Sequence, residues 1–125
     1  MTKSNQSKKH EMMNARNESV LISRGWVSRF EELHTDIAAF LPGCNGVWAV
    51  ESELRSNAYW IRRNAMRNER NGAYGIVFVT ESEAVAVKVR KIVSSLPDSV
   101  KKKTVVVTAD NFTPGFVKTV MEGRS

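Results

Sequence analysis

The chain of 125 residues has a single cysteine and no long apolar run, and both absences narrow what it can be. With Cys44 alone, neither an intrachain disulfide nor a zinc site built from several cysteines is available. No apolar stretch approaches the roughly 18 residues that a membrane-spanning helix needs. The first ten residues carry charge with no apolar segment behind them, so they do not resemble a secretory signal. We therefore expect a cytoplasmic protein with no membrane partner.

Acidic residues are also few: 13 Asp and Glu stand against 19 Lys and Arg, which gives a net charge of +6. A basic balance suits nucleic acid or another anionic partner, although an ordinary soluble protein can carry it as well. The length is most simply that of one domain with its own core. We expect residues 1–8, which are polar and basic, to form a disordered tail, and residues 9–125 to form a single domain.

Apolar spacing and turn residues predict helices that alternate with strands. Short links between the first three strands favour an antiparallel meander, and the helices between the later strands favour parallel pairing. Ser56 and the Thr80–Glu83 pair are the predicted helix starts. The expected class is α/β, a mixed sheet flanked by helices in the order αβββαβαβα. The predicted elements are a helix (9–24), three strands (26–30, 36–41, 47–54), a helix (56–71), a strand (75–80), a helix ending before Pro97, a strand (104–109) and a closing helix (113–123).

Three carboxylates fall on or beside these predicted strands. Asp36 begins the second strand, and Glu51 and Glu53 lie two residues apart on the third, so these two glutamates share a face. Burying a charged carboxylate beside an apolar core costs free energy unless a cation is paired with it. Carboxylate oxygens are hard ligands, which suit Mg²⁺ or Mn²⁺. A second interpretation stays open, in which Glu51 and Glu53 lie on the solvated face of an amphipathic strand and pair with arginines.

Three segments together resemble a known family. They read Arg-Gly-Trp-Val-Ser-Arg (24–29), Thr-Asp-Ile-Ala-Ala (35–39) and Trp-Ala-Val-Glu-Ser-Glu-Leu (48–54). With the order of elements, they resemble the PD-(D/E)xK nuclease superfamily, which has the restriction-endonuclease-like fold. The nearest likeness is to small archaeal Holliday-junction-resolvase-like proteins and to nuclease-like proteins of mobile elements. The resemblance covers about residues 9–109.

This resemblance implies a catalytic set. Asp36 and Glu51 would be the ligands of Mg²⁺ or Mn²⁺, and Glu18 on the first helix would add a carboxylate, with Glu11 as the second choice. Glu53 occupies the position where the family usually has a lysine, so it would add a ligand or act as a base. The resemblance also implies a homodimer, since cutting two strands needs two sites.

The predicted helix over 56–71 is basic and aromatic. Arginines grip phosphate through two parallel hydrogen bonds, and an aromatic ring beside them can stack on a base. In the other interpretation, Trp60 and Ile61 face the core and the arginines form a solvated face. The candidate nucleic-acid-binding residues are Arg55, Tyr59, Arg62, Arg63, Arg67 and Arg70.

The sequence therefore predicts a DNA-binding, metal-dependent endonuclease-like protein that hydrolyses phosphodiesters, with branched or mobile-element DNA as candidate substrates. The alternative is a catalytically inactive subunit of the same fold that binds DNA or serves as a scaffold in a replication, repair or mobile-element complex. The missing lysine favours the alternative. A protein-interaction module also stays open, if the arginine helix is buried in a partner.

Overall fold

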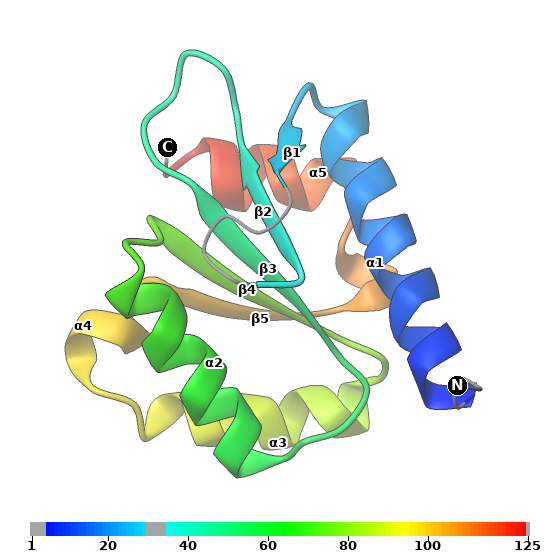
Figure 1. Cartoon of the computed structure of the whole chain (residues 1–125), viewed down its shortest axis with the longest axis vertical. Helices are drawn as coiled ribbons and strands as arrows, with labels where there is room; N and C mark the ends of the chain where they lie inside the picture. The colour runs from blue at the N-terminus through cyan, green and yellow to red at the C-terminus, as the bar shows by residue number, and fades with distance from the viewer. Residues whose placement is uncertain (1–4, 30–34, 125) are drawn as a thin grey trace.

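A five-stranded sheet in the order β1-β2-β3-β4-β5 forms the centre of the molecule, with helices on both of its faces (Figure 1). The computed structural model describes residues 5–29 and 35–124. The strands are β1 (Val27–Arg29), β2 (Ile37–Phe40), β3 (Trp48–Glu53), β4 (Gly75–Thr80) and β5 (Thr104–Thr108). The helices are α1 (Asn5–Ser23), α2 (Ala58–Arg70), α3 (Glu83–Ser94), α4 (Asp98–Lys101), the 3₁₀ turn η1 (Ala109–Asn111), α5 (Pro114–Phe116) and its π-helical continuation η2 (Val117–Glu122).

The pairing of the strands confirms the predicted mixed sheet. Strands β1, β2 and β3 pair antiparallel, as their short links require. Strands β3, β4 and β5 pair parallel, with α2 in the first crossover and α3 and α4 in the second. The α/β class and the antiparallel three-strand meander are therefore both present in the structure.

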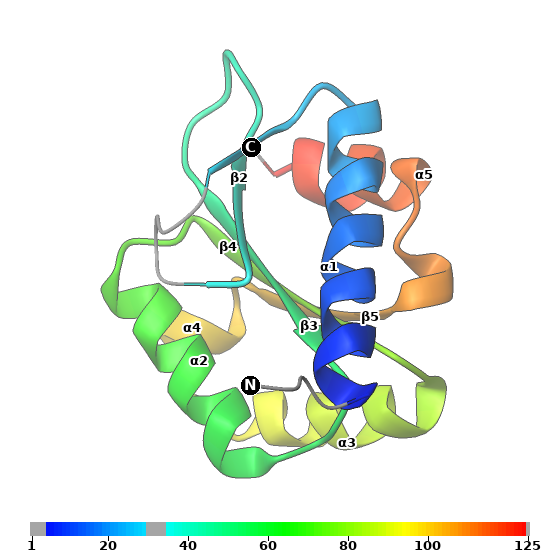
Figure 2. The same ribbon diagram turned by 45° about the vertical axis from the view of Figure 1, so that its right-hand side comes forward.

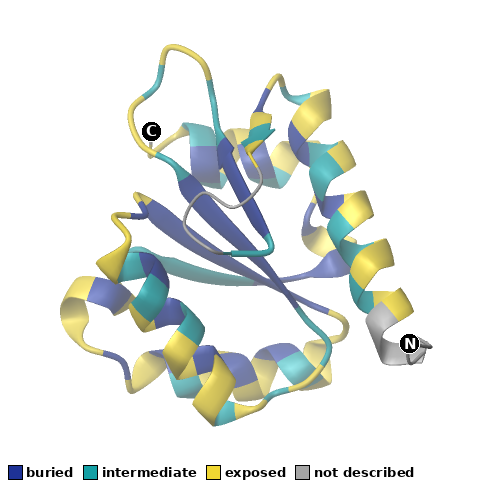
Figure 3. Cartoon of the chain, in the orientation of Figure 1, coloured by how far each residue is buried: buried dark blue, intermediate teal, exposed yellow. Residues whose placement is uncertain are grey.

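The sheet separates two apolar cores, because the side chains of a strand alternate between its faces. Trp48 and Val50 of β3 pack with α1 and the C-terminal helices. Ala49, between them, packs with α2, α3 and α4 on the other face. Figure 2 shows α1 beside the C-terminal helices and α2 beside α3, and Figure 3 shows the buried strands between exposed outer helix surfaces. By the same alternation, Glu51 and Glu53 belong to the face that α2 covers.

The helix boundaries follow local polar bonds. The side chain of Asn57 caps α2 by accepting a hydrogen bond from the backbone N–H of Trp60. Ser82 caps α3 by accepting from the N–H of Val85. The predicted starts at Ser56 and Thr80 are therefore each too early by one or two residues. Thr80 is instead the buried last residue of β4, and its hydroxyl lies 3.3 Å from the carbonyl oxygen of Val107.

Other boundaries also differ from the predicted ones. Helix α1 begins at Asn5, inside the segment expected to be a disordered tail. This start was missed because the first turn of the helix is polar and so shows no apolar periodicity. The short α4 and η1 were not predicted, and Phe30 of the predicted first strand lies outside the described residues. No helix within residues 5–29 and 35–124 is long and apolar enough to cross a membrane.

Candidate functional site

Asp36 and Glu51 meet at the edge where β2 begins. Ile37 pairs with Val50 in the antiparallel register, so Asp36 stands next to Glu51. The backbone N–H of Asp36 donates to Oε1 of Glu51 at 2.9 Å, and the hydroxyl of Thr35 donates to the same oxygen. In return, the backbone N–H of Ser52 donates to Oδ2 of Asp36 at 2.9 Å. The predicted convergence of these two carboxylates is thus present and is fixed by backbone donors.

Glu53 adds a third carboxylate to this cluster. Glu51 is only 2% exposed, and its burial, together with the charge of Asp36, raises its pKa. Burial, and then repulsion from Glu51 and Asp36, raises the pKa of Glu53 to about 8. The interpretation of Glu51 as a solvated strand residue is therefore wrong. Three acids that repel one another in a partly buried place are a favourable position for a cation.

His10 is the side chain of α1 that reaches the carboxylates. Its Nε2 lies 3.0 Å from Oδ2 of Asp36. That hydrogen bond raises the pKa of His10, and the negative charges of Asp36, Glu53 and Glu51 add to the effect while burial opposes it. The sequence reasoning missed this residue, because its partner is 26 positions away and the contact depends on how α1 docks on the sheet.

Glu18, the predicted carboxylate of the first helix, lies elsewhere. It is two helical turns beyond His10, and its Oε2 accepts a hydrogen bond of 2.9 Å from the hydroxyl of Ser28 on β1. Glu11, the second choice, is exposed on α1. The structure therefore brings together Asp36, Glu51 and Glu53 from the predicted set but places Glu18 outside the cluster.

A small polar network joins α1 to β3 behind the carboxylates. The hydroxyl of Ser52 donates to Oδ1 of Asn14, and the side-chain amide of the buried Asn17 donates to the hydroxyl of Ser52 at 3.0 Å. Buried polar groups satisfied in this way define a single docking geometry. The network therefore holds the helix that carries His10 against the strand that carries Glu51 and Glu53.

Helix α2 covers the face of the sheet that carries Glu51 and brings the charge of one arginine, Arg67, to bear on it. The charge of Arg67 acts on Glu51, lowering its pKa against the larger effect of burial, and Nη2 of Arg67 donates to Oδ1 of Asn64 at 3.2 Å. Ile61 is fully buried, but Trp60 is 51% exposed, so only one of these two residues faces the core. The other candidate nucleic-acid-binding residues of this segment are exposed: Arg55, Tyr59, Arg62, Arg63 and Arg70.

Metal binding at this cluster would depend on how its carboxylate oxygens are arranged. Within the part of the chain that the structure describes, no group of three or more His, Cys, Asp or Glu residues is arranged to hold a metal ion. His10 engages one oxygen of Asp36, and Thr35 engages one oxygen of Glu51. The donor chemistry nevertheless fits Mg²⁺ or Mn²⁺, because carboxylate oxygens are the ligands that these ions prefer. A cation bound there would compete with these two hydrogen bonds.

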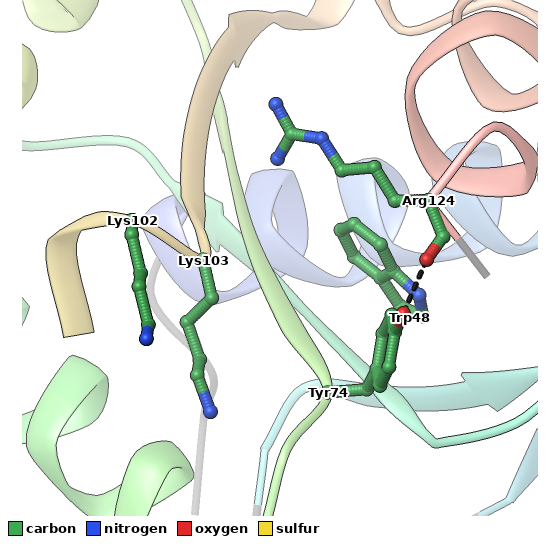
Figure 4. A pocket seen from close by; sticks show the side chains of 5 residues that line it. All are labelled: Trp48, Tyr74, Lys102, Lys103 and Arg124. Carbon is green, nitrogen blue, oxygen red and sulfur yellow. Dashed lines mark hydrogen bonds between the residues drawn. The ribbon is translucent and has the colours of Figure 1, made fainter. Parts of the chain in front are cut away.

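A separate pocket of about 260 Å³ lies at the opposite end of β3 (Figure 4). Trp48, which begins β3, lies with its ring centroid 6.2 Å from that of Tyr74. Lys103 points its Nζ at the carbonyl oxygen of Ala73, 2.9 Å away. The residues that line the pocket are Trp48, Tyr74, Lys102, Lys103 and Arg124. None of them is a carboxylate, so this pocket takes no part in the candidate site.

No family model, no curated protein and no solved structure matches this chain. The geometry of the carboxylates and of α2 is therefore what indicates a function.

Proposed function

We propose that this protein binds DNA and hydrolyses its phosphodiesters with Mg²⁺ or Mn²⁺, on a restriction-endonuclease-like fold. The observation that carries the proposal is the convergence of Asp36, Glu51 and Glu53 beside a basic helix. The element order also supports it, since a helix, an antiparallel meander, a second helix and a parallel strand follow one another as the resemblance implies. The cytoplasmic location and the homodimer stay predictions.

In this proposal, each side chain has a separate role. Asp36 and Glu51 would hold the metal, which when bound supplies charge neutralisation at the phosphate and a more acidic water. The pKa of Glu53, about 8, lies near neutral pH, and a group with such a pKa can both accept and donate a proton there. His10 orients Asp36 and places positive charge near the position where the family has its lysine. Arg67, whose charge acts on Glu51, would contact the phosphate.

The test is cleavage of labelled branched, single-stranded and duplex DNA by the whole protein, with Mn²⁺ and with EDTA. We expect Asp36→Asn and Glu51→Gln each to lower metal-dependent cleavage about a hundredfold or more, because each removes a ligand charge. The matched control is Asp110→Asn, whose carboxylate is 94% exposed and lies 3.9 Å from Arg16. Circular dichroism checks that the variants fold. Cleavage by folded Asp36→Asn at the rate of the parent would refute the assignment.

A second candidate function is an inactive DNA-binding or scaffold subunit of a replication, repair or mobile-element complex. The glutamate at position 53 favours it, because a carboxylate cannot supply the positive charge of the family's lysine. Binding that is sensitive to salt, with no strand breaks at any Mn²⁺ or Mg²⁺ concentration, would select this function over hydrolysis.

A further inference from the structure

Helix α2 presents a group of exposed aromatic and guanidinium side chains, here named the aromatic patch: Tyr59, Trp60 and Arg63. Tyr59 is 63% exposed and Trp60 is 51% exposed. The two rings meet edge to face, with centroids 5.1 Å apart and an interplanar angle of 77°. The guanidinium carbon of Arg63 lies 5.3 Å from the centroid of the Trp60 ring. The other two tryptophans, Trp26 and Trp48, are buried, so this exposure is particular to α2.

The aromatic patch lies on the same stripe of α2 as Arg67, the arginine whose charge acts on Glu51. Trp60, Arg63 and Arg67 are spaced i, i+3 and i+7, so they share one stripe of α2. Arg67, at the far end of this stripe, lies close enough to Glu51 to change its pKa. A ligand that covers this stripe would extend from the aromatic patch to Arg67.

The charge around the aromatic patch is almost entirely positive. Arg62 and Arg70 are exposed on the same helix. The one acidic residue of α2, Glu69, is paired with Lys103 at 2.5 Å and so does not offset the arginines. Aromatic faces beside guanidinium groups complement a ligand that carries both bases and phosphates.

We infer that the aromatic patch binds an unpaired nucleotide, so that the substrate class is DNA with a single-stranded segment. A base in a duplex shows only its edge, because its faces are covered by its neighbours, whereas an aromatic ring needs a free face to stack on. This inference names the substrate of the proposed nuclease and depends on the proposed function for cleavage, but the binding itself can be measured without cleavage.

The first experiment uses tryptophan fluorescence of the whole protein in EDTA, which prevents hydrolysis. An oligothymidylate of about 16 nucleotides should quench the emission, because Trp60 is the exposed tryptophan. A duplex of the same length should quench it much less. In Trp60→Phe the single strand should still bind, as fluorescence anisotropy of a labelled strand will show, but the quenching should be lost. Quenching that persists in Trp60→Phe would overturn the inference.

The second experiment measures affinity for the labelled single strand at low salt. Trp60→Ala should weaken binding about tenfold, since stacking on one aromatic contributes about 1–3 kcal/mol per base. The matched control is Val87→Ala, which removes a large apolar side chain that is 57% exposed on α3 and should leave the affinity unchanged. Equal affinity of the parent for single strand and duplex, or undiminished binding by Trp60→Ala, would overturn the inference. If the parent binds as expected but never cuts DNA, only the proposed hydrolysis fails.

Discussion

Burial, followed by repulsion within the cluster of Asp36, Glu51 and Glu53, makes the stability of this protein depend on pH. Glu51 and Glu53 each have a raised pKa, and so does His10 beside them. A glutamate with a raised pKa binds a proton in the folded state that it has already lost in the unfolded state. The folded state is therefore favoured at low pH and loses that advantage as the pH rises. The protonated His10 acts in the same direction. Its contribution to the stability of the folded state is complete below pH 6.5, the ordinary pKa of histidine, and is lost as the pH rises above the pKa of His10 in the folded state.

Glu53→Gln tests this at a single residue. The pKa of Glu53 rises from 4.5 to about 8, so the stability of the parent should fall with pH across that window. Removing the charge should leave the free energy of unfolding nearly unchanged at pH 4.5 and raise it at pH 8, relative to the parent, by about 4 kcal/mol at most. Urea denaturation at a series of pH values, without divalent cations, measures the difference. Glu83→Gln, which changes an exposed carboxylate on α3, is the control. A pH-independent difference between Glu53→Gln and the parent would contradict the prediction.

For single residues of the site, the sequence predicted which carboxylates meet but not which other side chains contact them. Asp36 and Glu51 could be paired because a tight turn and strand alternation are local properties. His10 could not be found, since its contact with Asp36 depends on the packing of α1 on a distant strand. One of the two interpretations of the basic helix placed both Trp60 and Ile61 in the core, but neighbours on a helix point about 100° apart, and only Ile61 faces inward.

Among the elements, strands were predicted more accurately than helix ends. β4 was predicted at Gly75–Thr80 and has those bounds, because an apolar run between turn residues marks a buried strand clearly. The start of a helix depends on which polar side chain accepts a hydrogen bond from a free backbone N–H. Ser56 and Asn57 are both suitable caps, so the sequence alone does not decide between them. Short helices such as α4 carry too few residues for a periodic pattern, so the sequence did not reveal them.

The start of α2 offers a matched pair of variants. Asn57→Ala removes the side chain that accepts from the N–H of Trp60 at 3.1 Å, and it should lower the free energy of unfolding by about 1 kcal/mol. Ser56→Ala changes the neighbouring residue, which does not cap the helix, and should cost less than about 0.5 kcal/mol. Thermal and urea unfolding, followed by circular dichroism, compare the two. A larger loss in Ser56→Ala would mean that α2 begins one residue earlier than in this structure.

For the whole molecule, the net charge of +6 means that the proposed binding of DNA could depend either on a general positive field or on one surface. Helix α2 carries four arginines, Arg62, Arg63, Arg67 and Arg70, whereas the opposite face of the sheet is covered by α1 and the C-terminal helices (Figure 2). The mixed sheet itself was predicted from the sequence. The exposed arginines of α2 were expected as well, but the side of the sheet on which α2 lies was not predicted, because it depends on how the helices divide between the two faces.

The salt dependence of binding to a single strand separates these two possibilities. Each phosphate contact adds about 0.7 to the slope of log affinity against log salt concentration. Arg63→Ala should therefore reduce that slope by about 0.7, while Lys118→Ala, which removes the same charge from the opposite face, should leave it unchanged. Trp60→Ala should weaken binding equally at every salt concentration, because stacking releases no counterions. Equal slope changes in Arg63→Ala and Lys118→Ala would mean that the overall charge, and not α2, holds the strand.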